Sequence, residues 1–114
     1  MLQINAPFAA SEAGEIIAWS RILDEEEALC IVNGNGVAAR GGDVVVEAEL
    51  NGAPSAKFQV VANSAQAAAV AVGGAYTGPH PVGSAEYVRF RDNTAFVEIR
   101  DLPPSEVLVL TNLP

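Results

Sequence analysis

Residues 16–33 read Ile-Ile-Ala-Trp-Ser-Arg-Ile-Leu-Asp-Glu-Glu-Glu-Ala-Leu-Cys-Ile-Val-Asn, and this stretch decides the fold class. Two apolar runs of strand length, 16–22 and 28–33, flank the acidic residues 24–27, and Gly34 follows the second run. Apolar runs of this length that are joined by a short polar turn are typical of a β-hairpin. We therefore predict a hairpin with a solvated acidic turn, and nothing in it has the pattern of a catalytic motif.

Strand signals recur along the rest of the chain. In 44–50 the apolar residues alternate with two glutamates, the period of two that a strand with one buried face requires. Asn51-Gly52 then predicts a turn, within a loop longer than two residues, that joins this strand to the next one at 57–62. Three closing strands are expected at 87–90, 95–100 and 106–111.

Short strands with turn signals about every 8 to 12 residues predict an all-β fold, an antiparallel β-sandwich of Greek-key type with about seven to eight strands. The alanine-rich segment 64–72 is either a short helix, capped by Ser64 and stopped by Gly73, or an edge strand of small residues. Residues 76–83 are predicted to form a loop. We expect the core to include Ile17 or Ile22, Val44, Val46, Phe58, Val60, Val88, Phe90, Val97, Ile99 and Leu108.

The length of the chain indicates a single domain. Its 114 residues can bury a continuous core, whereas a (β/α)8 barrel needs about 200 residues or more. Pro7 and Gly14 interrupt a segment with only scattered apolar residues. We therefore predict an extended lead-in over 1–14 and one β-sandwich domain over 15–114.

The composition argues against several classes of partner. The net charge of −8 repels nucleic-acid backbones and anionic lipid surfaces. No apolar run approaches the roughly 18 to 20 residues of a membrane span, so no membrane partner is expected. The single cysteine, Cys30, cannot form an internal disulfide, which favours a reducing compartment such as the cytoplasm. Its apolar neighbours predict a small, buried side chain.

No pattern in the sequence indicates a catalytic, metal-binding or cofactor-binding residue. His80 is the only histidine and lies between two prolines, which favours a rigid loop residue over a member of a triad or a metal site. The acidic run 24–27 lacks the alternating ligands and the central glycine of a calcium loop. The glycine clusters match neither a phosphate loop nor a dinucleotide-binding loop. We therefore expect no catalytic residue, no metal and no cofactor.

The aromatic residues offer the one set of candidate contact residues. Trp19 is the only tryptophan, and with Tyr76 or Tyr87 it could form a platform on which a sugar ring stacks. A single tryptophan within a strand is more often part of a core or an interface. Trp19, Tyr76 and Tyr87 are therefore predicted as interface or sugar contacts.

Several segments, taken in order, resemble one protein family. They are 17–22 (Ile-Ala-Trp-Ser-Arg-Ile), the acidic turn 24–27, the strand end Val32-Asn33, and 102–110 (Leu-Pro-Pro-Ser-Glu-Val-Leu-Val-Leu). Together they resemble the C-terminal all-β domain that follows the catalytic barrel in α-amylase-family enzymes, glycoside hydrolase family 13. The resemblance covers most of the chain, and its motifs are short and mostly structural.

The resemblance implies a parent enzyme that acts on α-glucosidic bonds through carboxylates on the loops of its barrel. Because it begins after the barrel, no catalytic or calcium-binding residue can be assigned here. The chain itself would be a non-catalytic domain that packs on and stabilises the barrel of the same polypeptide, and an α-glucan-binding module is the alternative. An apolar patch on one sheet with Trp19 at its edge would favour the first function, and an exposed aromatic pair would favour the second.

Overall fold

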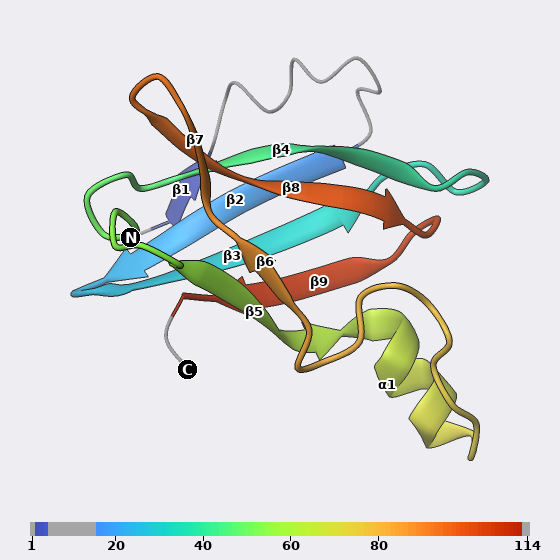
Figure 1. The fold of residues 1–114 in the computed structure, drawn as a ribbon. Coiled ribbons are helices and arrows are strands. Elements are labelled where there is room, and N and C mark those ends of the chain that lie inside the picture. The colour runs from blue at the N-terminus through green and yellow to red at the C-terminus, as the bar shows by residue number, and fades with distance from the viewer. Residues whose placement is uncertain (1, 5–15, 113–114) are drawn as a thin grey trace.

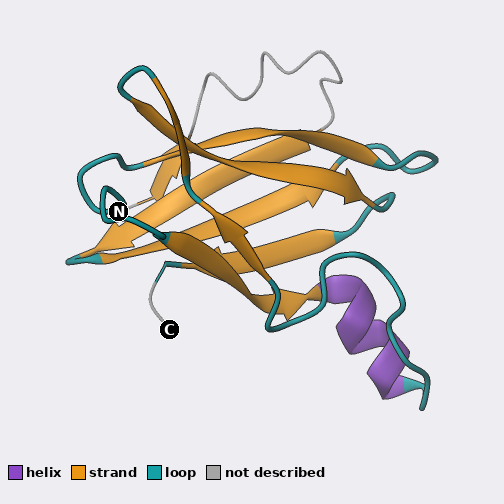
Figure 2. Ribbon diagram, viewed as in Figure 1, coloured by secondary structure: helices purple, strands orange, loops and turns teal. Residues whose placement is uncertain are grey.

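The computed structural model describes residues 2–4 and 16–112, which form two antiparallel β-sheets packed face to face (Figures 1 and 2). The six-stranded sheet has the order β1-β2-β3-β9-β5-β6 and the three-stranded sheet the order β4-β8-β7. The predicted antiparallel β-sandwich is confirmed. Its strands are β1 (Leu2–Ile4), β2 (Ile16–Leu23), β3 (Glu26–Asn33), β4 (Arg40–Val46), β5 (Lys57–Asn63), β6 (Ala85–Tyr87), β7 (Arg89–Arg91), β8 (Thr94–Leu102) and β9 (Val107–Thr111).

The hairpin predicted from residues 16–33 is formed by β2 and β3, which pair along their whole length from Ile16 opposite Asn33 to Leu23 opposite Glu26. Asp24 begins the turn with φ of 56°, a left-handed conformation that aspartate tolerates better than most residues. The turn is shorter than predicted, because only Asp24 and Glu25 lie outside the strands. The last two of the four acidic residues begin β3.

The predicted lead-in over 1–14 lies mostly outside the described residues. Within it, Leu2–Ile4 form β1, an edge strand that pairs with β2 opposite Trp19 to Arg21. The sequence does not indicate this pairing, since so short a run carries little periodicity.

The core between the two sheets contains most of the residues predicted for it. Val44, Val46, Phe58, Val60, Val97, Ile99 and Leu108 are all buried, and Val88 is partly buried against them. The prediction is wrong for β2, where Ile16 and Ala18 face the core and Ile17 is 46 % exposed. Ile22 is only partly buried. Phe90 is also misassigned, because it lies on β7 at the edge of the three-stranded sheet and is half exposed.

The strand predicted over 44–50 is displaced toward the N-terminus. It begins at Arg40 and ends at Val46 as β4, which pairs with β8. After Val46 the chain crosses to the other sheet, so Asn51 lies in a crossover between sheets and not in a hairpin turn. The Asn51 side chain donates to the carbonyl oxygen of Glu47, which closes a turn where the sequence pattern predicts the end of the strand.

The strand predicted over 87–90 is two strands in different sheets. β6 pairs with β5, and β7 pairs with β8. Between them the amide of Val88 donates to the carbonyl oxygen of Ala56 at 2.8 Å, which fixes the point where the chain changes sheets.

The alanine-rich segment is a helix, α1 (Ser64–Ala71), and not an edge strand. Its N-cap is Asn63, whose side chain accepts from the Gln66 amide, so the predicted cap at Ser64 is one residue late. Gly73, with φ of +79°, ends the helix as predicted. Within the described part of the chain, no helix has the length and apolar character that crossing a membrane requires.

Candidate docking surface

The outer face of the six-stranded sheet carries two rows of apolar side chains. They alternate with the buried core positions of β2, β3, β9 and β5. The strand register aligns them across the sheet into a first row of Ile17, Val32 and Val107, and a second row of Trp19, Cys30, Val109 and Ala62. We call these seven residues the outer rows. None of them is charged, and each is exposed or only partly buried.

The outer rows end where the next row of the same sheet becomes polar. That row runs through Arg21, Ala28, Thr111 and Gln59. The hydroxyl of Thr111 donates to a carboxylate oxygen of Glu26 at 3.0 Å, so this part of the face forms polar contacts of its own. The apolar surface is therefore confined to the half of the sheet that lies beside α1.

Cys30 lies within the second row. Contrary to the prediction of a buried side chain, it is only partly buried, because Leu29 and Ile31 on either side of it take the core positions. Partial burial raises the pKa of its thiol. A raised pKa leaves less thiolate, the nucleophilic form, and makes Cys30 a packing residue of this surface.

A groove of about 810 Å³ continues the outer rows onto the helix. We call it the α1 groove. Figure 1 shows α1 projecting past the end of β5. The groove is lined by Val61, Ala62, Asn63, Ser64, Gln66, Ala67, Val70, Ala71, Val82, Val107 and Val109. Three of these residues also belong to the outer rows, so the two features form one surface.

The three predicted contact residues do not come together. Trp19 lies in the outer rows on β2, and Tyr87 lies opposite Lys57 on β6, where it is 58 % exposed. Four strand-to-strand steps separate β2 from β6, a distance of about 19 Å. The two rings are therefore too far apart to stack on the same sugar ring. Tyr76 lies elsewhere, in a polar network.

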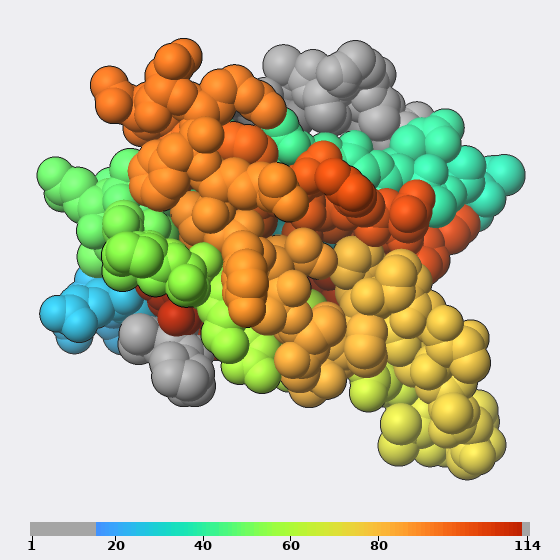
Figure 3. All heavy atoms as spheres, in the orientation of Figure 1, coloured from blue at the N-terminus to red at the C-terminus, as the bar shows by residue number. Residues whose placement is uncertain are grey.

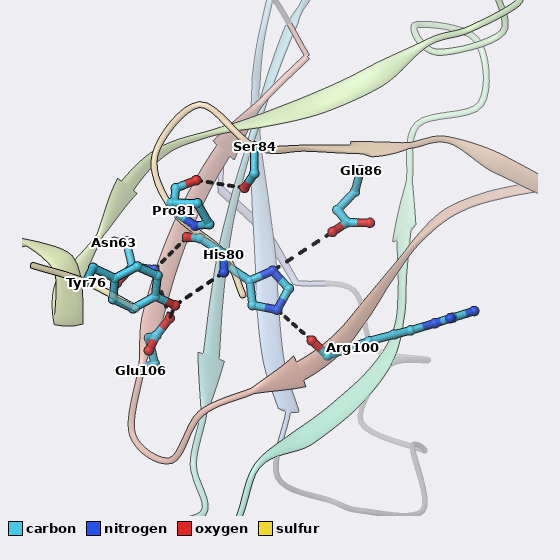
Figure 4. A network of polar contacts seen from close by, with 8 residues as sticks. All are labelled: Asn63, Tyr76, His80, Pro81, Ser84, Glu86, Arg100 and Glu106. Atoms are coloured by element: carbon cyan, nitrogen blue, oxygen red, sulfur yellow. Dashed lines mark hydrogen bonds and ion pairs between the residues drawn. The ribbon is translucent and has the colours of Figure 1, made fainter. Parts of the chain in front are cut away.

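That network joins the loop after α1 to the sandwich (Figure 4). The Tyr76 hydroxyl donates to Glu106 Oε2 at 2.6 Å, and Asn63 Nδ2 donates to the same oxygen at 2.8 Å. Asn63 Nδ2 also donates to the carbonyl oxygen of His80 at 2.7 Å. Burial and the bond to Glu106 raise the pKa of the Tyr76 hydroxyl, so it remains a donor. The sequence carries no signal for this network, because its members are far apart along the chain.

His80 is 3 % exposed and lies at the centre of this network. Its Nε2 is 2.6 Å from the carbonyl oxygen of Arg100, which can only accept, so Nε2 carries the proton. In the neutral ring Nδ1 is then unprotonated, and it is buried without a hydrogen-bond partner. Glu86 Oε2 lies 3.9 Å from Nδ1 (Figure 4). The predicted rigid loop histidine is thus a buried link between the loop and β8.

A second buried polar cluster surrounds Glu27. This residue is 1 % exposed, so the prediction of a fully solvated acidic run is wrong at its last position. Glu27 Oε1 accepts from the Glu47 amide and from Asn51 Nδ2, both at 3.0 Å. Burial raises the pKa of the Glu27 carboxyl, and the charge of Glu47 adds to the effect. The sequence could not indicate this role, because the crossover that carries Asn51 supplies the partners.

Neither cluster has the form of a catalytic or metal site. The carboxylates of Glu27 and Glu106 are buried and hydrogen-bonded to their own domain. Within residues 2–4 and 16–112, no three His, Cys, Asp or Glu side chains converge on a point that could hold a metal ion. No family model and no curated protein matches this sequence.

Proposed function

We propose that this chain is the accessory, non-catalytic C-terminal β-domain of an α-amylase-family glycoside hydrolase that acts on α-glucans. In this proposal the outer rows pack against the catalytic (β/α)8 barrel and stabilise it. The observation that carries the proposal is the set of seven uncharged residues that the register aligns on the outer face of the six-stranded sheet.

The apolar character of this face supports docking. An antiparallel sheet that faces water on one side normally alternates between apolar residues inside and polar residues outside. β3 instead alternates between a core face with Leu29 and Ile31 and an outer face with Cys30 and Val32. Interfaces between domains of one chain usually bury roughly 600 to 1,500 Å². The outer rows and the α1 groove together span four strands and a helix, enough surface for an interface of this class.

No observation on the described residues favours the α-glucan-binding alternative. Sugar sites in proteins rely on aromatic faces and on polar groups that await a ligand. The α1 groove contains no aromatic residue, and Trp19 and Tyr87 are four strands apart. The structure therefore supports protein docking better than sugar recognition.

The first test is the coding sequence upstream of this chain. The proposal expects a (β/α)8 barrel there, in the same reading frame, with the three active-site carboxylates of the α-amylase family on its loops. An upstream sequence that encodes no such barrel would overturn the assignment to this family.

The second test uses that enzyme with the domain attached. Val32→Glu and Val107→Glu place charges within the outer rows, and Val37→Glu, at a residue that is 90 % exposed on a loop, is the matched control. We expect the first two variants to lower the melting temperature by several degrees, with kcat on maltooligosaccharide unchanged. The control should change neither quantity. If the outer-row variants instead abolished starch-granule binding at unchanged stability, the glucan-binding function would be the better account.

A further inference from the structure

The α1 helix is attached to the sandwich but not covered by it. None of its residues is buried, Val70 is 64 % exposed, and Val72 just after the helix is 84 % exposed. Figure 3 shows the helix, in yellow, as a protrusion from the body of the domain. A short helix in water is marginally stable without packing on one face. The exposed valines of α1 and of the facing loop therefore form an interface that this chain alone leaves open.

Each polar side chain that lines the α1 groove already forms a hydrogen bond within the domain. Asn63 caps the helix, and the Ser64 hydroxyl accepts from the Val107 amide at 2.9 Å. Gln66 Oε1 accepts from the Val82 amide at 2.7 Å. The remaining lining residues are alanine and valine. The groove thus offers an occupant mainly aliphatic contact.

The groove is held in shape before any partner arrives. The loop that carries Val82 is held by two hydrogen bonds (Figure 4). Tyr76 bonds to Glu106, and the carbonyl oxygen of His80 accepts from Asn63. The bond from the Val82 amide to Gln66 ties the same loop to the helix. A site that is organised in advance loses less conformational entropy on binding.

Much of the backbone around the groove is already paired, which leaves little sheet edge for an added strand. Its floor includes β9, which is paired on both sides, with β3 and with β5. On β5, Val60 exchanges two backbone hydrogen bonds with the loop, through Gly83 and Ser84. An occupant must therefore satisfy its own backbone, as an α-helix does.

The distribution of charge selects among possible occupants. Residues 58–85, which supply most of the groove, contain no Asp, Glu, Lys or Arg, although the whole chain carries a net charge of −8. A second copy would bring a further −8, and an anionic membrane would be repelled in the same way. A helix with an aliphatic side and basic flanks matches both the uncharged groove and the acidic domain around it.

We propose that the α1 groove binds one amphipathic helix of a protein partner, through aliphatic side chains spaced as i, i+3, i+4 and i+7, with lysine or arginine on its flanks. This inference rests on the proposed function in one respect, since the outer ring of a (β/α)8 barrel is a natural source of such a helix. The groove, and not the outer rows alone, then fixes where the barrel docks.

The test titrates the isotope-labelled full chain with a synthetic helical peptide that has leucine at these four positions and lysine on its flanks. Amide resonances of the groove, Val61, Val70 and Val82 among them, should shift. Val70→Asp and Val82→Asp should weaken binding by about tenfold or more, because each would bury a charge. Val37→Asp, on an exposed loop, should leave the affinity unchanged. A peptide with serine in place of leucine should not bind.

Four results would overturn the inference. The peptide could fail to bind. It could also shift the amide resonances of Ile17 and Val32 and leave those of the groove unchanged, which would be consistent with docking by the outer rows. The chain could also self-associate through the groove, or bind vesicles of neutral phosphatidylcholine through it, which would replace the proposed occupant. The upstream coding sequence tests the parent enzyme separately, so failure of the family assignment and failure of the groove can be distinguished.

Discussion

The outer faces of the two sheets differ in charge. In both sheets the residues alternate between inward and outward positions. On the three-stranded sheet, Ala95, Val97 and Ile99 point into the core, and the outer face carries charged pairs. Arg100 Nη2 lies 2.8 Å from Glu98 Oε1, and Arg91 Nη1 lies 3.4 Å from Asp43 Oδ2. On the six-stranded sheet, the outer rows contain no charge.

Two aromatic residues, one from each outer face, differ in how far the domain itself covers them. Phe96 faces outward on β8 but is only 7 % exposed, and the Arg91 guanidinium lies 4.7 Å from its ring centroid. Trp19 lies in the uncharged outer rows. One outer face therefore covers its aromatic residue within the domain, whereas the other leaves an apolar surface that a partner can cover.

The largest difference in stability is expected between two substitutions, Phe96→Ala and Trp19→Ala. We expect Phe96→Ala to lower the free energy of unfolding of the chain by roughly 3 kcal/mol, because it removes a buried ring. Trp19→Ala should cost about 1 kcal/mol, since its ring is only partly buried. Urea denaturation measures both values. Equal losses of unfolding free energy would show that Trp19 stabilises the isolated chain as much as Phe96 does, which would contradict the difference between the two faces.

A smaller difference in stability is expected between substitutions of a core valine and of an outer-row valine. Val97→Ala, in the core, should lower the free energy of unfolding by roughly 1 to 3 kcal/mol. Val107→Ala, in the outer rows, should lower it by about 0.5 kcal/mol. In the complete enzyme the cost of Val107→Ala should rise, because docking would bury this side chain. A cost that stays the same with and without the barrel would contradict docking through the outer rows.

Glu27→Gln should alter how stability depends on pH. The pKa of Glu27 is raised in the folded protein, so its contribution is fully present below the unfolded pKa of about 4.3 and is lost as the pH rises through the folded value. Glutamine keeps the accepting oxygen without the charge. The Glu27→Gln variant should be more stable than the unmodified protein at neutral pH, and the difference should vanish in acid. Thermal melts over a pH series test this, and a variant that is less stable at neutral pH would show that the charge is needed.

The smallest effect is expected on the charged outer face. Arg91→Ala removes the guanidinium above Phe96 and should lower the free energy of unfolding by roughly 0.5 to 1 kcal/mol. Arg91→Met restores apolar cover over the ring and should recover part of the loss. If Arg91→Ala instead lowered the free energy of unfolding as much as Phe96→Ala, Arg91 would stabilise the fold through more than its contact with the Phe96 ring.

Much of the fold can be predicted from the sequence because strand periodicity is local. The β2–β3 hairpin and the inward positions of β5 and β8 follow from residues within a few positions of one another, whereas the sequence left 64–72 open between a helix and an edge strand. The errors fall where local signals are ambiguous. Ile16 and Ile17 are both apolar, so the pattern cannot say which faces the core, and pairing with β3 decides it. Asn51-Gly52 has the composition of a hairpin turn but lies in a crossover.

The candidate surface was predictable only in outline. The sequence indicates an apolar β-domain with Trp19 on its first long strand, but the outer rows come from four strands whose order in the sheet does not follow the chain. The α1 groove likewise needs the loop that Tyr76 and Glu106 hold in place from 30 residues apart. Neither feature has a sequence signal of its own.

The sequence by itself determined most of the strands, the acidic charge and the uncharged segment 58–85, because these properties depend on residue type and spacing. Only the tertiary structure decided which apolar residues are enclosed and which remain open to a partner. It also decided that Glu27 and His80 are buried, since their hydrogen-bond partners come from distant segments. The physical reason is that side-chain period is a local property, whereas burial depends on what packs against each face.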